Sequence, residues 1–102
     1  MSDITSLYRA LAERVREGDG TASVTLRRSA FTNAGLEEPS RTLVDKVARD
    51  VHEVIDADIA AVRAAGLSED QIFELIVCAA VGQATRQYEK AIAALDAATN
   101  GS

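Results

Sequence analysis

The stretch "LSEDQIFELIVCAAVGQA", residues 67–84, decides the fold class of this chain. Ser68 with Gln71 three residues later is a capping-box pattern, in which each side chain accepts a hydrogen bond from the other residue's backbone N–H at the start of a helix. Over residues 75–81 the sequence is apolar at every position. A helix that is apolar all round is buried all round. The stretch therefore predicts a long buried helix over residues 69–97.

Shorter helices are expected before it. Apolar residues at helical spacing predict helices over 4–16, 24–34 and 39–54. A fourth helix follows, with Asp56 as its cap and Gly66 at its left-handed end. The whole chain, residues 1–102, is therefore predicted to be a single compact all-α domain of about five helices.

Composition excludes several classes of protein. The chain has 16 acidic and 11 basic residues, an excess of acids that argues against a nucleic-acid partner. Its single cysteine excludes an internal disulfide and fits a reducing compartment. The N-terminal residues mix charges into the apolar positions, unlike a signal peptide, and the longest apolar run is too short to span a bilayer. These features predict a soluble cytoplasmic protein without a membrane partner.

The apolar run also bears on assembly. A domain of this size can rarely surround a fully apolar helix by itself. Ala79, Ala80, Gly82 and Ala84 are small enough to let a neighbouring helix approach closely. The sequence therefore predicts a homo-oligomer.

Residues 48–84, "ARDVHEVIDADIAAVRAAGLSEDQIFELIVCAAVGQA", resemble the alkylhydroperoxidase D-like and carboxymuconolactone decarboxylase superfamily. The resemblance lies in a short helix, "AAVRAAGLSEDQI", followed by an apolar helix, "FELIVCAAVG", and extends over roughly residues 39–95. It implies an all-helical fold that forms dimers, trimers or hexamers through long buried helices. A hetero-oligomer with an intact family member is a second possibility.

The resemblance does not extend to the family's reactive groups. In the peroxidase-like branch, the paired cysteines would fall on Val51 and Val54, the histidine on Asp58 and the glutamate on Pro39. In the decarboxylase branch, the first histidine again falls on Asp58 and the second near Cys78. The active site is thus degenerate in this chain, and a thiol-dependent peroxidase is not expected because that chemistry needs a thiolate and a resolving thiol.

The only histidine, His52, lies in an acidic stretch, "DVHEVIDAD", over residues 50–58. It could act as a general base oriented by Asp56, or bind a metal with Asp56 or Glu53. One histidine among scattered acids falls short of a ligand set, so we expect no metal site and no cofactor. The competing interpretation is a half-exposed histidine at a helix junction with a bend at Ile55.

That junction interpretation places Val51 and Val54 toward the core, since they lie three residues apart on one helix face. It places Asp50 and Glu53 in solvent.

Three more residues are candidate catalytic groups. Cys78 could be a nucleophile lining a pocket, although a cysteine within an apolar helix is commonly a small hydrophobic core residue. Asp58 and Glu74 could form a carboxylate pair with a raised pKa that transfers a proton, or be ordinary solvated acids. Other polar residues are expected on solvated helix faces: Arg27, Arg28, Arg86, Tyr88 and Lys90. The alternatives are a phosphate clamp for Arg27 and Arg28, which lack an accompanying Gly-rich loop, and an interface position for Tyr88.

The sequence thus favours a non-catalytic structural or regulatory subunit that assembles into an oligomer. The alternative is a cofactor-independent lyase or isomerase that transfers protons through His52, Asp58 or Glu74. A redox role for Cys78 alone is a third hypothesis.

Overall fold

The computed structural model describes residues 2–100. These residues form an all-α fold without a β-strand, as the sequence predicts. Along the chain the elements are α1 (Ser2–Glu17), α2 (Val24–Thr32), α3 (Ser40–Arg49), the 3₁₀ turn η1 (Val51–Glu53), α4 (Asp56–Ala64) and α5 (Glu69–Asn100). None of the helices in this part of the chain is long and apolar enough to cross a membrane.

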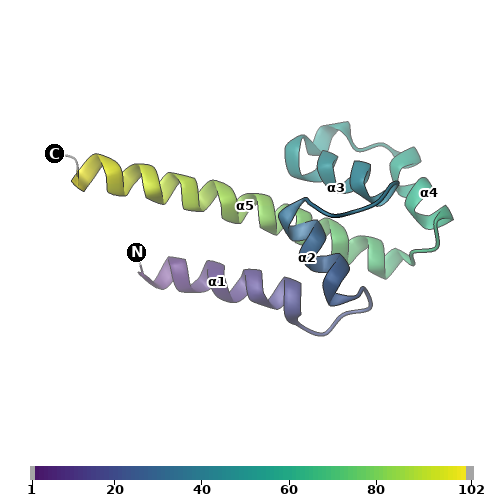
Figure 1. Cartoon of the computed structure of the whole chain (residues 1–102), viewed down its shortest axis with the longest axis horizontal. Coiled ribbons are helices and arrows are strands. Elements are labelled where there is room, and N and C mark those ends of the chain that lie inside the picture. The colour runs from purple at the N-terminus through teal and green to yellow at the C-terminus, as the bar shows by residue number, and fades with distance from the viewer. Residues whose placement is uncertain (1, 101–102) are drawn as a thin grey trace.

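The other helices all pack against α5, and the molecule measures 54 Å along its longest axis (Figure 1). Figure 1 shows α2, α3 and α4 gathered around the first half of α5, while α1 lies along its middle. Helix α1 runs antiparallel to α5, because the Thr5 hydroxyl lies 3.0 Å from the Tyr88 hydroxyl whereas Val15 O lies 3.1 Å from Cys78 Sγ. The chain thus consists of a cluster of short helices and a projecting α1–α5 pair.

The core lies where α2, α3 and α4 meet α5. Its largest fully buried side chains are Leu43 and Val44 from α3, Val62 from α4, and Leu75 and Cys78 from α5. Helix α2 approaches α5 closely at Gly82, where an added Cβ would lie only 2.0 Å from the carbonyl oxygen of Phe31. No side chain fits in that space, so this crossing requires glycine.

Local signals correctly predict the start of α5 and the end of α4. Ser68 N donates to Gln71 Oε1 at 2.8 Å, and Gln71 N donates to Ser68 Oγ at 3.1 Å. After α4, Gly66 has φ 111°, and its N–H donates to Arg63 O at 3.0 Å. Both predicted motifs are therefore confirmed at the level of individual hydrogen bonds.

Helix α2 differs from the prediction in two respects. It ends at Thr32 rather than at residue 34, because Asn33 takes the left-handed conformation with φ 54°. Arg27, expected on a solvated face, is only 5% exposed. Arg28 is exposed as expected, and its guanidinium lies 2.6 Å from the Glu17 carboxylate.

The junction between α3 and α4 also differs from the prediction. We expect the third helix to reach Val54, but α3 ends at Arg49 because Asp50 takes an extended backbone conformation (φ −156°, ψ 90°). The turn η1 follows. Val51, expected in the core, is 58% exposed, whereas Val54 is partly buried against the core. Only one of the two valines therefore faces inward.

The cap of α4 is a second correction at this junction. Ile55, with an extended backbone, precedes the first turn, and Asp56 lies within that turn and is exposed. The carboxylate of Asp58 accepts the Ile55 N–H at 2.9 Å. Asp58, not Asp56, therefore satisfies the free backbone donor at this helix start. Asp50 and Glu53 are exposed, as predicted.

The apolar run over residues 75–81 is covered mostly by the chain itself. Leu75, Cys78 and Ala79 are buried, Ile76, Val77 and Val81 are half-buried, and Ala80 is exposed. This run does not need a second copy to cover it, so the reason given above for oligomerisation is wrong. Large exposed apolar side chains occur on the α1–α5 pair and, at Val51 and Ile55, on the junction between α3 and α4.

Candidate functional site

Glu74, on the first half of α5, holds the loop between α1 and α2. Its carboxylate accepts backbone N–H bonds from Thr21 at 2.8 Å and Ala22 at 3.1 Å, and the Thr21 hydroxyl also donates to it. Burial raises the pKa of Glu74, but these hydrogen bonds and the charge of Arg27 lower it by more, so it lies below its usual range. Glu74 therefore lacks the raised pKa that we expect of a proton-transferring acid.

Arg27 secures the same loop from within. Its Nε donates to Ala22 O at 3.2 Å, and its Nη1 donates to Gly18 O at 2.6 Å and Val15 O at 3.4 Å. The buried guanidinium is thus satisfied by carbonyl groups from the end of α1 and the following loop. Sequence reasoning missed this residue because its partners are backbone atoms, which no residue type reveals.

Cys78 lies one turn after Glu74 on α5. It is 1% exposed, and its Sγ donates to Val15 O at 3.1 Å. Burial raises the pKa of the thiol, although the nearby Arg27 charge opposes this. The thiolate is the reactive form of cysteine, so the thiol is poorly suited to nucleophilic or redox chemistry at neutral pH.

Asp58 forms the least exposed ion pair of the described residues. Lys46 Nζ lies 2.9 Å from Oδ2 and 3.0 Å from Oδ1, and the Asp58 side chain is 12% exposed. The backbone hydrogen bond from Ile55 and the neighbouring Lys46 lower the pKa of Asp58. The carboxylate is therefore ionised and fully engaged in joining α3 to α4.

His52 lies exposed on η1. Its backbone N–H donates to the Asp50 carboxylate at 3.2 Å, but within residues 2–100 no hydrogen bond joins its ring to Asp56. In the same range no three His, Cys, Asp or Glu residues are grouped so that they could hold a metal ion. The geometry gives this histidine neither an orienting partner nor a ligand set.

The four candidate residues do not form one site. Glu74 and Cys78 line a cavity of about 540 Å³ together with Arg27, whereas His52 and Asp58 line neither this cavity nor the larger one described below. Comparison with protein-family models, curated proteins and solved structures finds no match. The resemblance to the alkylhydroperoxidase D-like superfamily stays a prediction from the sequence.

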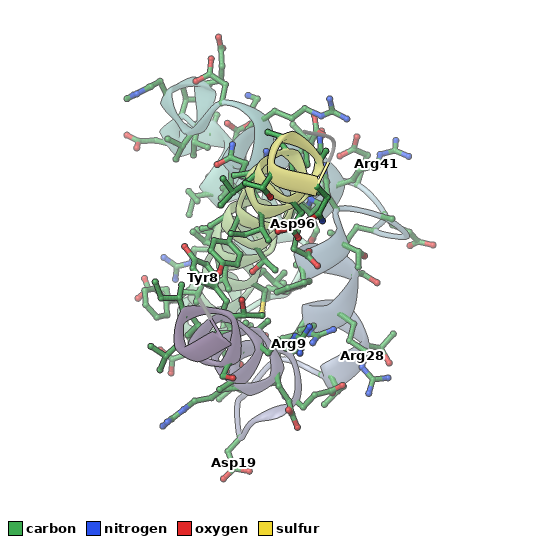
Figure 2. The ribbon with its side chains drawn as sticks, turned by 90° about the vertical axis from the view of Figure 1, so that its left-hand side faces the viewer. Tyr8, Arg9, Asp19, Arg28, Arg41 and Asp96 are labelled. Carbon is green, nitrogen blue, oxygen red and sulfur yellow. The ribbon has the colours of Figure 1, made fainter. Side chains whose placement is uncertain are left out.

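The larger cavity is a groove of about 740 Å³ between α1 and the second half of α5. Tyr8 and Tyr88 stack there, with ring centroids 4.4 Å apart. Thr85 Oγ1 is buried in the groove wall and has no hydrogen-bond partner within the described residues. In Figure 2, which looks along the pair, Arg9 and Asp96 lie on the same side. The charged side chains that line the groove are two basic and four acidic ones: Arg9, Arg16, Glu13, Glu17, Glu89 and Asp96.

The opposite side of the α1–α5 pair is apolar, and we call it the outer face. Its residues are Ile4, Leu7 and Leu11 of α1 and Phe73, Val77, Ala80, Ala84, Ala91 and Leu95 of α5. The two helices contribute to one continuous surface, because Leu11 lines the same cavity as Phe73 and Val77. Leu7 is 70% exposed and Phe73 is 66% exposed. An apolar surface of this extent on a small domain indicates an interaction site.

Proposed function

We propose that this chain is a non-catalytic subunit that acts by assembling with copies of itself through the outer face. The observation that carries the proposal is a contrast between the candidate catalytic side chains and the exposed apolar ones. The candidate catalytic residues are engaged within the fold or isolated from one another, while large apolar side chains are left uncovered.

The polar groups support the first half of this proposal. Glu74 is occupied by loop N–H groups, and Asp58 by Lys46 and the Ile55 N–H. Catalysis by proton transfer needs a group whose pKa lies near the working pH, and both carboxylates have pKa values below their usual range. The alternative lyase or isomerase would have to use Glu74 while it holds the loop.

The outer face supports the second half. Exposed apolar side chains on α1 follow helical spacing, at positions 4, 7 and 11, so they form one stripe rather than a scatter. Arg14, exposed one turn after Leu11, adds a positive charge at the end of this stripe. Burial of such side chains is worth about 25 cal/mol per Å² of apolar surface, which is the main driving force for stable association.

Light scattering of the purified protein tests the proposal. At micromolar concentration we expect a mass of at least two chains. Leu7→Gln should shift this equilibrium toward monomer by placing a polar amide in the interface. Arg9→Gln is the matched control, since it introduces the same side chain at an exposed position two residues away, on the groove side of α1. A monomeric parent protein, or equal effects of the two variants, would contradict the proposal.

A further inference from the structure

We infer that two copies pair through antiparallel α5 helices, with a two-fold axis passing beside Ala84. This inference rests on the proposed function, and it adds the partner's orientation and register. It starts from the α5 part of the outer face. At 3.6 residues per turn, its members lie within a sector of about 60° of the helix surface.

The sizes of these side chains are similar on either side of the middle of the stripe, which makes the stripe complementary to a second copy of itself. The largest, Phe73 and Leu95, lie at the two ends of the stripe, and the alanines lie between them. Ala84 is the midpoint between positions 73 and 95. An antiparallel pair centred there places Phe73 against Leu95 of the partner subunit and Val77 against Ala91 of the partner subunit. Ala84 then faces its own copy at the centre, where two helix axes can approach to about 8 Å, and the exposed Gln87 lies at the edge of this contact.

Charge supports the same arrangement. The charged residues in the second half of α5 lie off the stripe: Arg86, Glu89, Lys90 and Asp96. The centre of an antiparallel pair therefore buries no charge of this part of α5, which would otherwise carry a large desolvation penalty, and Arg14 of α1 lies at the edge beside Leu11. A membrane surface is a poorer occupant, since the chain carries a net charge of −5 and anionic lipids attract basic segments.

The exposed apolar area suits a dimer. Leu7 and Leu11 of α1 lie beside the middle of the α5 stripe and extend the surface on one side. The large side chains of the outer face together expose on the order of 500 Å², which is the size of a functional patch on a small protein. With flanking polar atoms this approaches the roughly 800 Å² that each partner buries in a stable interface.

Cysteine cross-linking tests the register in a Cys78→Ala background. Under mild oxidation by dioxygen with a copper catalyst, Ala84→Cys should form an intermolecular disulfide in most of the protein, because a two-fold axis brings the two copies of this position together. Ala93→Cys is the matched control, an exposed alanine on the same helix that lines the groove. It should stay reduced.

A second pair of variants keeps the inference testable if Ala84→Cys does not fold. When Phe73→Cys and Leu95→Cys proteins are mixed, the mixed disulfide should exceed either self-linked product severalfold. A dimer that cross-links at position 93, or that gives mostly self-linked 73 and 95, would overturn the register and leave the proposed function standing. A monomeric parent would overturn both.

Discussion

The carboxylate of Asp58, on α4, binds both the preceding junction and helix α3. It accepts the Ile55 N–H that opens α4, and it pairs with Lys46 from α3. Both bonds favour the ionised form, which is why its pKa is lowered. An acid that resembles a catalytic group in the sequence thus serves to fix the angle between two helices.

This role separates Asp58 from its neighbour Asp56. Asp58→Ala should lower the midpoint of thermal unfolding by several degrees, because it leaves a backbone donor and an ammonium group without their acceptor. Asp56→Ala should lower it by clearly less, since Asp56 is exposed within the first turn. Thermal melts followed by circular dichroism at neutral pH measure both. Equal losses would contradict the assignment of the capping role to Asp58 alone.

At the scale of elements, α2 and α5 cross with their backbones in close contact. Gly82 lets the Phe31 carbonyl approach the α5 backbone, and Arg86 Nη1 donates to the same carbonyl oxygen at 2.6 Å. Arg86, expected on a solvated face, thus satisfies a free acceptor at the end of α2. Its partner could not be read from the sequence.

The crossing reverses an ordinary rule of helix stability. Glycine to alanine in a helix interior usually stabilises by about 1 kcal/mol. Gly82→Ala should instead destabilise the protein by about 1–3 kcal/mol, because the new methyl group would collide with backbone rather than with a movable side chain. Urea denaturation measures the change. Ala10→Gly, at an exposed position inside α1 that belongs to neither the outer face nor the groove, should cost about 1 kcal/mol and provides the reference for propensity alone.

At the scale of the whole molecule, carboxylates are the fold's acid-sensitive groups. The pKa is lowered in Glu17, Glu38, Asp45, Asp58 and Glu74. The folded state therefore binds fewer protons than the unfolded chain at mildly acidic pH, and protonation favours unfolding. The stability from these groups is complete above the unfolded pKa of about 4 and is lost as the pH falls through the lower folded values.

We therefore expect the unfolding free energy to be nearly constant between about pH 7 and 5 and to fall below about pH 4. Glu74→Gln should cost about 1–2 kcal/mol at neutral pH, a value reduced for its partial exposure, and should make the acid loss shallower. Denaturant titrations at a series of pH values measure both. Glu13→Gln, on an exposed part of α1, is the control and should leave the profile unchanged.

The predictable parts of the fold are those specified by neighbouring residues. The helix start at Ser68 and the helix end at Gly66 depend on hydrogen bonds within one turn, so their residue types suffice. The burial of Arg27 and the capping by Asp58 depend on contacts with other elements, and residue type leaves several outcomes open. The candidate site was harder still, because Glu74 has the same appearance in a sequence whether it transfers protons or holds a loop.

The exposed C-terminal end of α5 has a consequence for the local unfolding of this helix. Residues 93–100 are all exposed, whereas Leu75, Cys78 and Ala79 of the same helix are buried. Opening the last turns breaks backbone hydrogen bonds but uncovers almost no apolar surface, so it is far easier than opening the middle. Amide protons along this one helix should therefore exchange with solvent at rates that rise steeply toward the C-terminus. A partner lying against Leu95 would slow that exchange, so the end of the helix would report on assembly.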